Sequence, residues 1–203
     1  MLGWYARTLG ASHAALEAAA AEVEPGASGL VALDWWNGNR SILADADLSG
    51  TILGLGLRTT QAEIYRALIE SIALGNRRII ENFRAHGVAV ERIVACGGIA
   101  VKSPLTMQIV ADVSGLPVSV PASSEVPARG AALFGAVAAG VFSDIDAAVS
   151  AISPGVANTY SPDPDATAVY DRIYEIYKTL YGLLGERHQD LMHRLKRLAT
   201  ERR

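Results

Sequence analysis

A strand-like apolar run that ends in two glycines constrains the fold of this chain more than any other feature. Residues 92–96 have the length and composition of a buried strand, and Gly97 and Gly98 follow as a tight turn. Ser103 then has the character of an N-cap, with Pro104 at the first helical position. A strand that ends in glycines before a helix lets a ligand approach bare backbone. An ordinary tight turn that needs positive φ explains the glycine pair equally well, so the spacing leaves both interpretations open.

A long amphipathic helix precedes this strand. Thr60 and Glu63 form a capping-box pattern, and apolar residues recur from there at near-helical spacing up to Phe83. Gly87 lies just beyond the expected end of the helix. The pattern predicts one long helix that begins after Thr60.

The segments after the glycine pair continue the alternation of helix and strand. We expect a helix from Ser103 to about Ser114, a strand over residues 116–120 and a small-residue helix over residues 127–141 that packs closely against a sheet. Such alternation is typical of an α/β domain whose sheet is at least partly parallel and carries helices on its faces.

Both ends of the chain are also predicted to be largely helical. Residues 1–23 have helical periodicity, and short strands are expected over residues 30–33 and 50–57. Residues 153–164 are rich in Pro, Ser and Asp, which predicts a surface loop. A further amphipathic helix follows, and its regularly spaced tyrosines are expected to pack in the core: Tyr170, Tyr174, Tyr177 and Tyr181.

The composition fits a soluble protein with a core of ordinary size. A chain of 203 residues, 50% of them hydrophobic, can bury roughly 70% of its unfolded surface without the help of a metal or a disulfide. The single cysteine, Cys96, favours a reducing, cytoplasmic compartment. A net charge of -3 argues against a nucleic-acid partner. The longest uncharged apolar stretch, residues 130–142, is too short for a membrane span.

Several familiar chemistries lack their motifs here. A dinucleotide fold needs an acidic residue about 20 positions after the glycine run, and the residue found there is Val118. A phosphate loop of the Gly-x-x-x-x-Gly-Lys-Ser/Thr type and a Gly-x-Ser-x-Gly nucleophile elbow are both absent from the sequence. The four histidines are scattered and Cys96 stands alone, so we predict no metal site. Gln108 and Asp112 lie one helical turn apart, and an exposed polar face is the simpler interpretation of that pair.

Three spaced blocks resemble the C-terminal domain of the FGGY carbohydrate kinases. The main block is residues 95–118, which contains the glycine pair; it is preceded by residues 65–70 and followed by residues 130–132 together with residues 138–140. Residues 29–40 resemble the ribulokinase branch of that family. The similarity is clearest from Gly29 to about Gly185.

The resemblance implies a fold, an activity and a set of binding residues. The fold would be an α/β domain of the ribonuclease-H-like, actin-like superfamily, with a mixed sheet flanked by helices. Residues 1–185 would be the nucleotide-side domain, incomplete at its N-terminal end, and residues 186–203 a basic polar helix or tail. In the intact enzyme, ATP with Mg would phosphorylate a ribulose hydroxyl. The nucleotide would be bound by Gly97, Gly98, Ser103, Gln108 and Gly130.

The same resemblance limits what this chain does alone. The family's catalytic base, its sugar pocket and its first phosphate loops belong to the part that precedes the matched segment, so no catalytic residue is assigned and the pentulose is a partner only of the intact enzyme. Three hypotheses stay open: part of a pentulose kinase that is inactive alone, a non-catalytic nucleotide-responsive or homo-oligomerising module derived from a sugar kinase, and an unrelated α/β binding domain.

Overall fold

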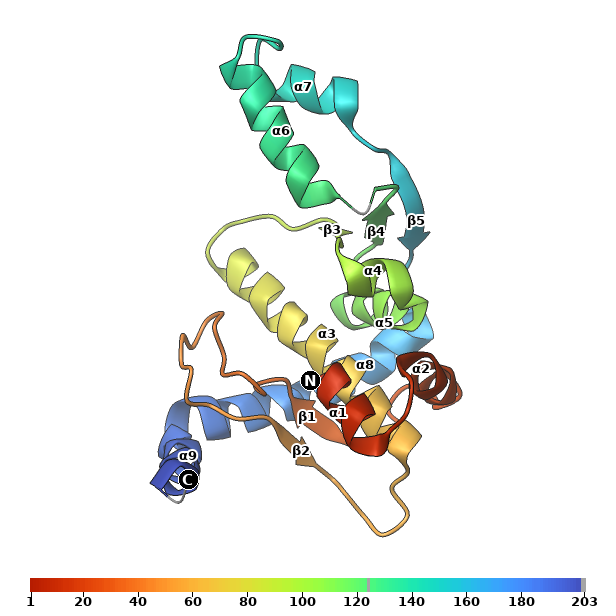
Figure 1. Cartoon of the computed structure of the whole chain (residues 1–203). Coiled ribbons are helices and arrows are strands. Elements are labelled where there is room, and N and C mark those ends of the chain that lie inside the picture. The colour runs from red at the N-terminus through yellow and green to blue at the C-terminus, as the bar shows by residue number, and fades with distance from the viewer. Residues whose placement is uncertain (124, 202–203) are drawn as a thin grey trace.

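A long central helix, α3 (Gln61–Ala85), organises the molecule, and most of the body packs around it (Figure 1). The computed structural model describes residues 1–123 and 125–201. The other helices are α1 (Leu2–Leu9), α2 (His13–Ala21), α4 (Gly98–Lys102), α5 (Pro104–Ser114), α6 (Val126–Ala138), α7 (Ile145–Ile152), α8 (Pro164–Gly182) and α9 (Gln189–Glu201). The strands are β1 (Val31–Leu33), β2 (Thr51–Leu53), β3 (Ile93–Val94), β4 (Val118–Pro121) and β5 (Val156–Tyr160), and a π-helical turn, η1 (Leu183–Arg187), joins α8 to α9.

The predicted capping box at the start of α3 is confirmed. The Thr60 hydroxyl accepts a hydrogen bond from the Glu63 amide at 3.2 Å, and the Glu63 carboxylate accepts one from the Thr60 amide at 2.7 Å. Two of the otherwise unpaired amides at the helix start are thereby satisfied. The helix continues to Ala85, two residues beyond the predicted end.

The described residues form two sheets, and the larger one is mixed as predicted. β3 pairs in parallel with β4, with Ile93 opposite Val118, and β4 pairs antiparallel with β5, with Val118 also opposite Tyr160. β1 and β2 form a separate antiparallel pair, with Val31 opposite Leu53. α4 and α5 lie between the parallel strands β3 and β4 in the chain. This order of strand, helices and strand confirms the α/β prediction.

Residues 153–164 lie at the surface as predicted, but they are not all loop, because β5 lies within them. Val156 is 60% exposed, and most of the strand faces solvent. An edge strand of this kind carries no apolar run that sequence periodicity can detect. Its conformation depends on the backbone hydrogen bonds to β4.

The predicted buried strand over residues 92–96 is shorter and more exposed than expected. Only Ile93–Val94 is a strand, and Val94 is 57% exposed. The Ile93 amide donates to the Pro117 carbonyl, and the Ala95 amide donates to the Ser119 carbonyl, each at 2.9 Å. Pairing with β4 therefore holds this segment in place although one of its faces is uncovered.

The N-terminal helical region is broken into two helices. Gly10 ends α1 in the left-handed conformation, with φ 64°, and the Ser12 hydroxyl caps α2 by accepting from the Ala15 amide at 3.2 Å. The strand expected over residues 50–57 is also shorter than predicted, since β2 ends at Leu53.

The tyrosines of α8 are core residues, as predicted. Tyr170, Tyr174 and Tyr177 are fully buried, and Tyr181 is 2% exposed. The Tyr170 hydroxyl joins α8 to α3 because it accepts from Arg66 at 2.8 Å and donates to Glu70 at 3.0 Å. Arg66 and Glu70 are themselves ion-paired at 2.8 Å and buried.

Helices α6 and α7 form an arm that stands away from the body (Figure 1). The sequence predicts that the helix over residues 127–141 packs against a sheet, and this is wrong: no residue of α6 is buried, and Phe134 is 68% exposed. The arm is held together by contact between α6 and α7 and by a 2.7 Å hydrogen bond from Arg129 to the Ile152 carbonyl.

The C-terminal helix contacts the loop between β1 and β2. Met192 of α9 is buried, His193 lies 2.7 Å from the Asp45 carboxylate, and Lys196 lies 3.0 Å from Asp47. Among the described residues, no helix has both the length and the apolar character needed to cross a bilayer.

Candidate functional site

A cavity of about 780 Å³ lies where α1, α2 and α3 meet the glycine turn before α5. Its polar lining comes from segments that are far apart in the sequence: His13, Glu17, Asp34, Tyr65, Lys102 and Ser103. Ile72 and Ile99 supply apolar surface. This volume is within the range of roughly 300–1,000 Å³ that is typical of small-molecule pockets.

Gly98, the second residue of the glycine pair, lines this cavity, whereas Gly97 does not. Gly97 has φ 91° and ψ -177°, a conformation that is essentially restricted to glycine. Gly98 begins the short helix α4 and lines the cavity, and a Cβ atom built on it would meet no atom within 4 Å. The space next to the Gly98 backbone is therefore open to a ligand.

Ser103 holds two helices together at the floor of the cavity. Its hydroxyl accepts from the Thr106 amide at 3.2 Å, which caps α5 as the sequence predicts. The same hydroxyl donates to the Glu17 carboxylate of α2 at 2.8 Å. Ser103 thus positions Glu17, whose carboxylate is a hydrogen-bond acceptor on the cavity wall.

His13 and Tyr65 form the aromatic part of the lining. The Tyr65 hydroxyl lies 3.0 Å from His13 Nδ1, and the two ring centroids are 6.4 Å apart. Burial, together with the nearby Glu17 carboxylate, raises the pKa of Tyr65 above its ordinary value. A tyrosine hydroxyl is protonated at neutral pH even without this shift, so it can donate to His13 Nδ1. Flat aromatic surface beside a carboxylate acceptor suits a heteroaromatic ring that has hydrogen-bond donors.

Gln108 lies outside the lining of this cavity. Its amide nitrogen donates to Asp112 and to the Ser161 carbonyl, both at 2.8 Å, and Asp112 also accepts from the Asp163 amide at 2.9 Å. These bonds fix the start of α8 against α5. The expectation of an exposed polar face here is wrong for Asp112, which is 6% exposed, and burial raises the pKa of its carboxyl.

Gly130 also lies outside the lining, on the α6 arm, and a Cβ atom at this position would meet no atom within 4 Å. Of the five residues expected to bind nucleotide, the structure brings Gly98 and Ser103 together in one cavity. Gly97 precedes Gly98 in the chain but does not line this cavity. Gln108 and Gly130 are placed elsewhere in this chain.

Sequence reasoning missed the contribution of His13, Glu17 and Tyr65. His13 and Glu17 have helical spacing on α2, but a polar face on an alanine-rich helix is indistinguishable from a solvated one. Tyr65 lies in one of the matched sequence blocks without a role being assigned to it. The contacts that reveal the site join residues more than 50 positions apart in the sequence, as in the hydrogen bond between His13 and Tyr65.

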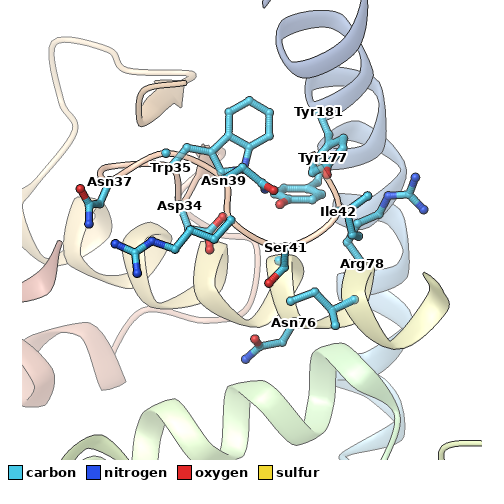
Figure 2. Close-up of a pocket in the computed structure, with 14 residues that line it drawn as sticks. Asp34, Trp35, Asn37, Asn39, Ser41, Ile42, Asn76, Arg78, Tyr177 and Tyr181 are labelled. Atoms are coloured by element: carbon cyan, nitrogen blue, oxygen red, sulfur yellow. The ribbon is translucent and has the colours of Figure 1, made fainter. Parts of the chain in front are cut away.

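Asp34 lines this cavity and also a smaller one of about 260 Å³; Figure 2 shows the residues around the smaller cavity. Asp34 follows β1 directly, and burial raises the pKa of its carboxyl to about 6. Its Oδ2 atom lies 2.9 Å from the position of a Cβ atom built on Gly75 of α3. The carboxyl therefore lies against bare helix backbone.

Within residues 1–123 and 125–201, no three His, Cys, Asp or Glu side chains come together as ligands for a metal ion. Magnesium in nucleotide sites is commonly held by substrate phosphates, water and one or two carboxylates.

Comparison with protein families and known proteins identifies the relatives of this chain. Residues 2–139 match the model of the FGGY family of carbohydrate kinases, C-terminal domain. A ribulokinase from Halalkalibacterium halodurans is 46% identical over 192 residues, which are 93% of this chain and 34% of that protein. A ribulokinase from Bacillus licheniformis is 47% identical over 183 residues, or 88% of this chain and 33% of that protein. The chain thus spans about a third of the length of these relatives.

Solved structures agree with this relationship. The crystal structure of a xylulose kinase from Rhodospirillum rubrum superposes with a TM-score of 0.79 and 35% identity, and it covers 95% of this chain and 38% of that one. A ligand-bound xylulose kinase from Lactobacillus acidophilus, at 21% identity, shares the fold with a TM-score of 0.83. The expected actin-like sugar-kinase fold is confirmed, and the chain belongs to the FGGY family of carbohydrate kinases, of which it represents the C-terminal domain.

Proposed function

We propose that this chain is the nucleotide-side part of a ribulokinase-like pentulose kinase. In the intact enzyme the γ-phosphate of MgATP would be transferred to a hydroxyl of ribulose, in the cytoplasm and as a step of arabinose use. The similarity to ribulokinases over nine-tenths of the chain supports the substrate class. The observation that carries the nucleotide assignment is the cavity that Gly98 and Ser103 share with His13, Glu17 and Tyr65.

The cavity suits the adenosine end of ATP. The open backbone at Gly98 lets a flat base or a ribose approach closely, and Ile72 and Ile99 supply apolar contact. The Glu17 carboxylate accepts hydrogen bonds from an exocyclic amine or a ribose hydroxyl. Gly97 would sit at the edge of the nucleotide, and Gln108 and Gly130 would have to act from outside this cavity. When bound, ATP supplies the phosphoryl group, and Mg would be carried mainly by its phosphates.

Titration calorimetry of MgATP into the 203-residue chain tests the nucleotide site. We expect saturable binding that adenosine competes away. Gly98→Trp should abolish it, because the new ring would fill the space next to the turn.

The matched control is Gly56→Trp, which adds the same ring at a position where a Cβ atom also meets nothing within 4 Å. Binding should survive in this control. Equal binding by wild type and Gly98→Trp, with both folded by circular dichroism, would contradict the assignment of the cavity.

A coupled assay with MgATP and ribulose tests the assignment of the chemistry to other parts of the enzyme. No catalytic residue is assigned to this chain, so we expect no turnover from the chain alone. Robust turnover would contradict the proposal that the base and the sugar pocket lie in the preceding part of the enzyme.

A second candidate is a non-catalytic module that self-associates. The exposed apolar residues of the arm favour it, among them Phe134 and Val149, which are 68% and 45% exposed. Light scattering over a range of concentrations discriminates the two. A constant monomer mass would exclude self-association, and a stable dimer that lacks nucleotide binding would favour the module over the kinase part.

A further inference from the structure

The loop between β1 and β2 has a backbone conformation that its residue types do not favour. Ile42 has φ 79° and Ala44 has φ 51°, and no other non-glycine residue in the described part of the chain has a positive φ. Such a value is uncommon for alanine and a true outlier for a β-branched side chain. A backbone of this kind persists only where the surrounding structure holds it in place. Contacts from outside the two strained residues must therefore stabilise this loop.

Helix α9 contacts the loop directly after the strained residues. His193 Nε2 lies 2.7 Å from Asp45 Oδ2. Lys196 Nζ donates to the Ala46 carbonyl at 2.7 Å and lies 3.0 Å from the Asp47 carboxylate. We call these contacts of His193 and Lys196 with residues 45–47 the α9 latch.

A backbone bridge connects the α9 latch to the strained part of the loop. Asn39 and Asp45 exchange two backbone hydrogen bonds, each 2.8 Å long, and the bridge closes the turn that contains Ile42 and Ala44. Asp45 thus takes part in both the bridge and the latch. Loss of its contact with α9 therefore weakens the support of the strained turn.

The turn of residues 39–45 forms part of the wall of the smaller cavity. Asn39, Ser41 and Ile42 line this cavity from the loop, and Asn76 and Arg78 line it from α3 (Figure 2). No described residue of α9 lines the cavity. A change in the latch would therefore reshape the cavity from a distance, through the position of the turn.

The contact between His193 and Asp45 depends on the charge of the imidazole. Histidine side chains commonly gain or lose their proton between about pH 5 and 8. The protonated ring forms an ion pair with a carboxylate, whereas the neutral ring keeps at most a hydrogen bond. Burial acts to raise the pKa of the Asp45 carboxyl, but hydrogen bonds from the Asp47 amide and from His193 outweigh it and lower this pKa below its ordinary value. Asp45 is therefore ionised over this range.

Most other charged groups around His193 are paired with one another or stand in water. The pairs are Lys196 with Asp47, and Asp190 with Arg194 at 4.0 Å. The turn η1 and the residue after it contribute Glu186, Arg187 and His188, and no described ion pair joins any of them to His193. Arg197, one turn further along α9, is exposed, so water and salt screen its charge. Asp45 is thus the charge that the protonated imidazole meets directly.

We propose that the α9 latch is a pH-sensitive switch: with His193 protonated it holds the turn of residues 39–45 in its strained conformation, and loss of that proton lets the turn open and reshapes the smaller cavity. The ion pair contributes only while the ring carries its proton, so the latch weakens as pH rises. This inference does not depend on the proposed nucleotide function.

Limited digestion of the chain with trypsin at two pH values tests the switch. Arg40 is exposed in the loop, and the rate of cleavage after it follows the population of the open turn when cleavage is slow. Cleavage after Arg58, which is exposed between β2 and α3, is measured in the same digest and corrects for the pH dependence of trypsin itself.

We expect the ratio of cleavage after Arg40 to cleavage after Arg58 to rise roughly 2- to 5-fold between about pH 6 and about pH 8. The rise is modest because the ion pair between His193 and Asp45 is partly exposed. An equal ratio at both pH values would overturn the proposal.

His193→Gln and a matched control assign the pH dependence to one contact. Glutamine stays neutral, so the ratio in His193→Gln should be high at both pH values and should not rise. Lys196→Met removes the other contact of α9 with the loop but no group that titrates in this range, so its ratio should be higher overall and should still rise. A rise that His193→Gln keeps and Lys196→Met removes would overturn the proposal.

Asp45→Asn tests the partner of the imidazole. It removes the carboxylate and should also abolish the rise, while circular dichroism checks that each variant is folded. If His193→Gln fails to fold, Asp45→Asn decides: a rise equal to that of wild type in this variant overturns the proposal.

Discussion

The tyrosines of α8 are equally buried, but their hydroxyl groups have different surroundings. Tyr170 bridges Arg66 and Glu70, so three polar groups from α3 and α8 satisfy one another inside the core. Tyr177, two turns further along, is just as buried and has no partner within the described residues. The contribution of a buried hydroxyl to the free energy of folding depends more on whether it has a hydrogen-bond partner than on its burial.

Tyr170→Phe and Tyr177→Phe make the same chemical change at two fully buried positions of one helix. Tyr170→Phe should lower the free energy of unfolding by about 1 to 3 kcal/mol, because Arg66 and Glu70 each lose a partner. Tyr177→Phe should leave it unchanged or raise it slightly, because only an unpaired group is lost. Urea denaturation measures both. A larger loss in Tyr177→Phe than in Tyr170→Phe would contradict this account.

Asp34 should make stability depend on pH. Its pKa is about 6 in the folded chain against an ordinary value of 3.8, so the folded state holds the proton more tightly and stability falls as pH rises between these values. A shift of this size corresponds to about 3 kcal/mol above the upper value. Asp34→Asn cannot ionise and should therefore be more stable than wild type well above pH 6, with the difference shrinking towards pH 3.8. Urea denaturation at several pH values measures this difference, and a pH-independent one would contradict the prediction.

At the scale of elements, two segments depend on glycine for different reasons. At position 97 glycine is required by the backbone conformation, because φ is 91°. At position 185 glycine is required by the close packing, since a Cβ atom there would lie 2.6 Å from Leu43 and 2.8 Å from Trp35. Gly185 lies in η1, so this close contact packs the π-helical turn against the loop that contains the small cavity.

Gly97→Ala should destabilise the chain by about 1 to 3 kcal/mol through backbone strain. Gly98→Ala is the comparison, because φ at Gly98 is not positive and a Cβ atom there meets nothing. It should leave the melting temperature unchanged or slightly higher, since alanine favours helix. Equal effects of the two substitutions in thermal unfolding would show that the conformation of Gly97 is not what requires glycine.

Gly185→Ala should loosen the attachment of α9. The added methyl group forces apart Trp35, Leu43 and the helical turn, and such overpacking typically costs about 1 to 3 kcal/mol. Gly182→Ala in the adjoining turn is the control, because its nearest neighbour would be the Glu186 carboxylate at 3.6 Å, an ordinary contact. Thermal unfolding of the two variants should differ, and a similar loss in both would contradict the proposed packing.

The whole molecule combines a packed body with a poorly covered arm. The core lies among α3, α5, α8 and β1, whereas α6 contributes no buried residue and α7 buries only Ala148. Few buried apolar contacts predict a low local free energy of opening. The arm is attached to the body through the short strands β4 and β5 (Figure 1).

Hydrogen exchange followed by mass spectrometry should separate these two parts. Amides of α6 and α7 should exchange much faster than those in the middle of α3, because opening the arm exposes little apolar surface. The C-terminal turns of α3, near the exposed Phe83, serve as an internal reference for a frayed helix end. Protection of α6 equal to that of central α3 would contradict this division.

The sequence by itself determined those helices whose capping residues and periodic apolar residues lie close together in the chain. The capping box at Thr60, the Ser103 cap of α5 and the buried tyrosines of α8 all depend on residues within a few turns of one another. The glycine pair and the matched blocks likewise led to the family through local patterns. Hydrophobic periodicity and capping are local interactions, and they therefore leave a trace in a single sequence.

What only the tertiary structure decided involves partners that are far apart in the chain. β5 is a strand because β4 lies beside it, and the cavity forms because α2 places His13 and Glu17 against Tyr65 and Ser103. Asp34 is half-buried against α3 because Gly75 leaves room for its carboxyl. The arm stayed uncovered although its sequence is apolar. Burial, strand pairing and pKa are set by what the rest of the fold brings near a residue, and no local pattern encodes those neighbours.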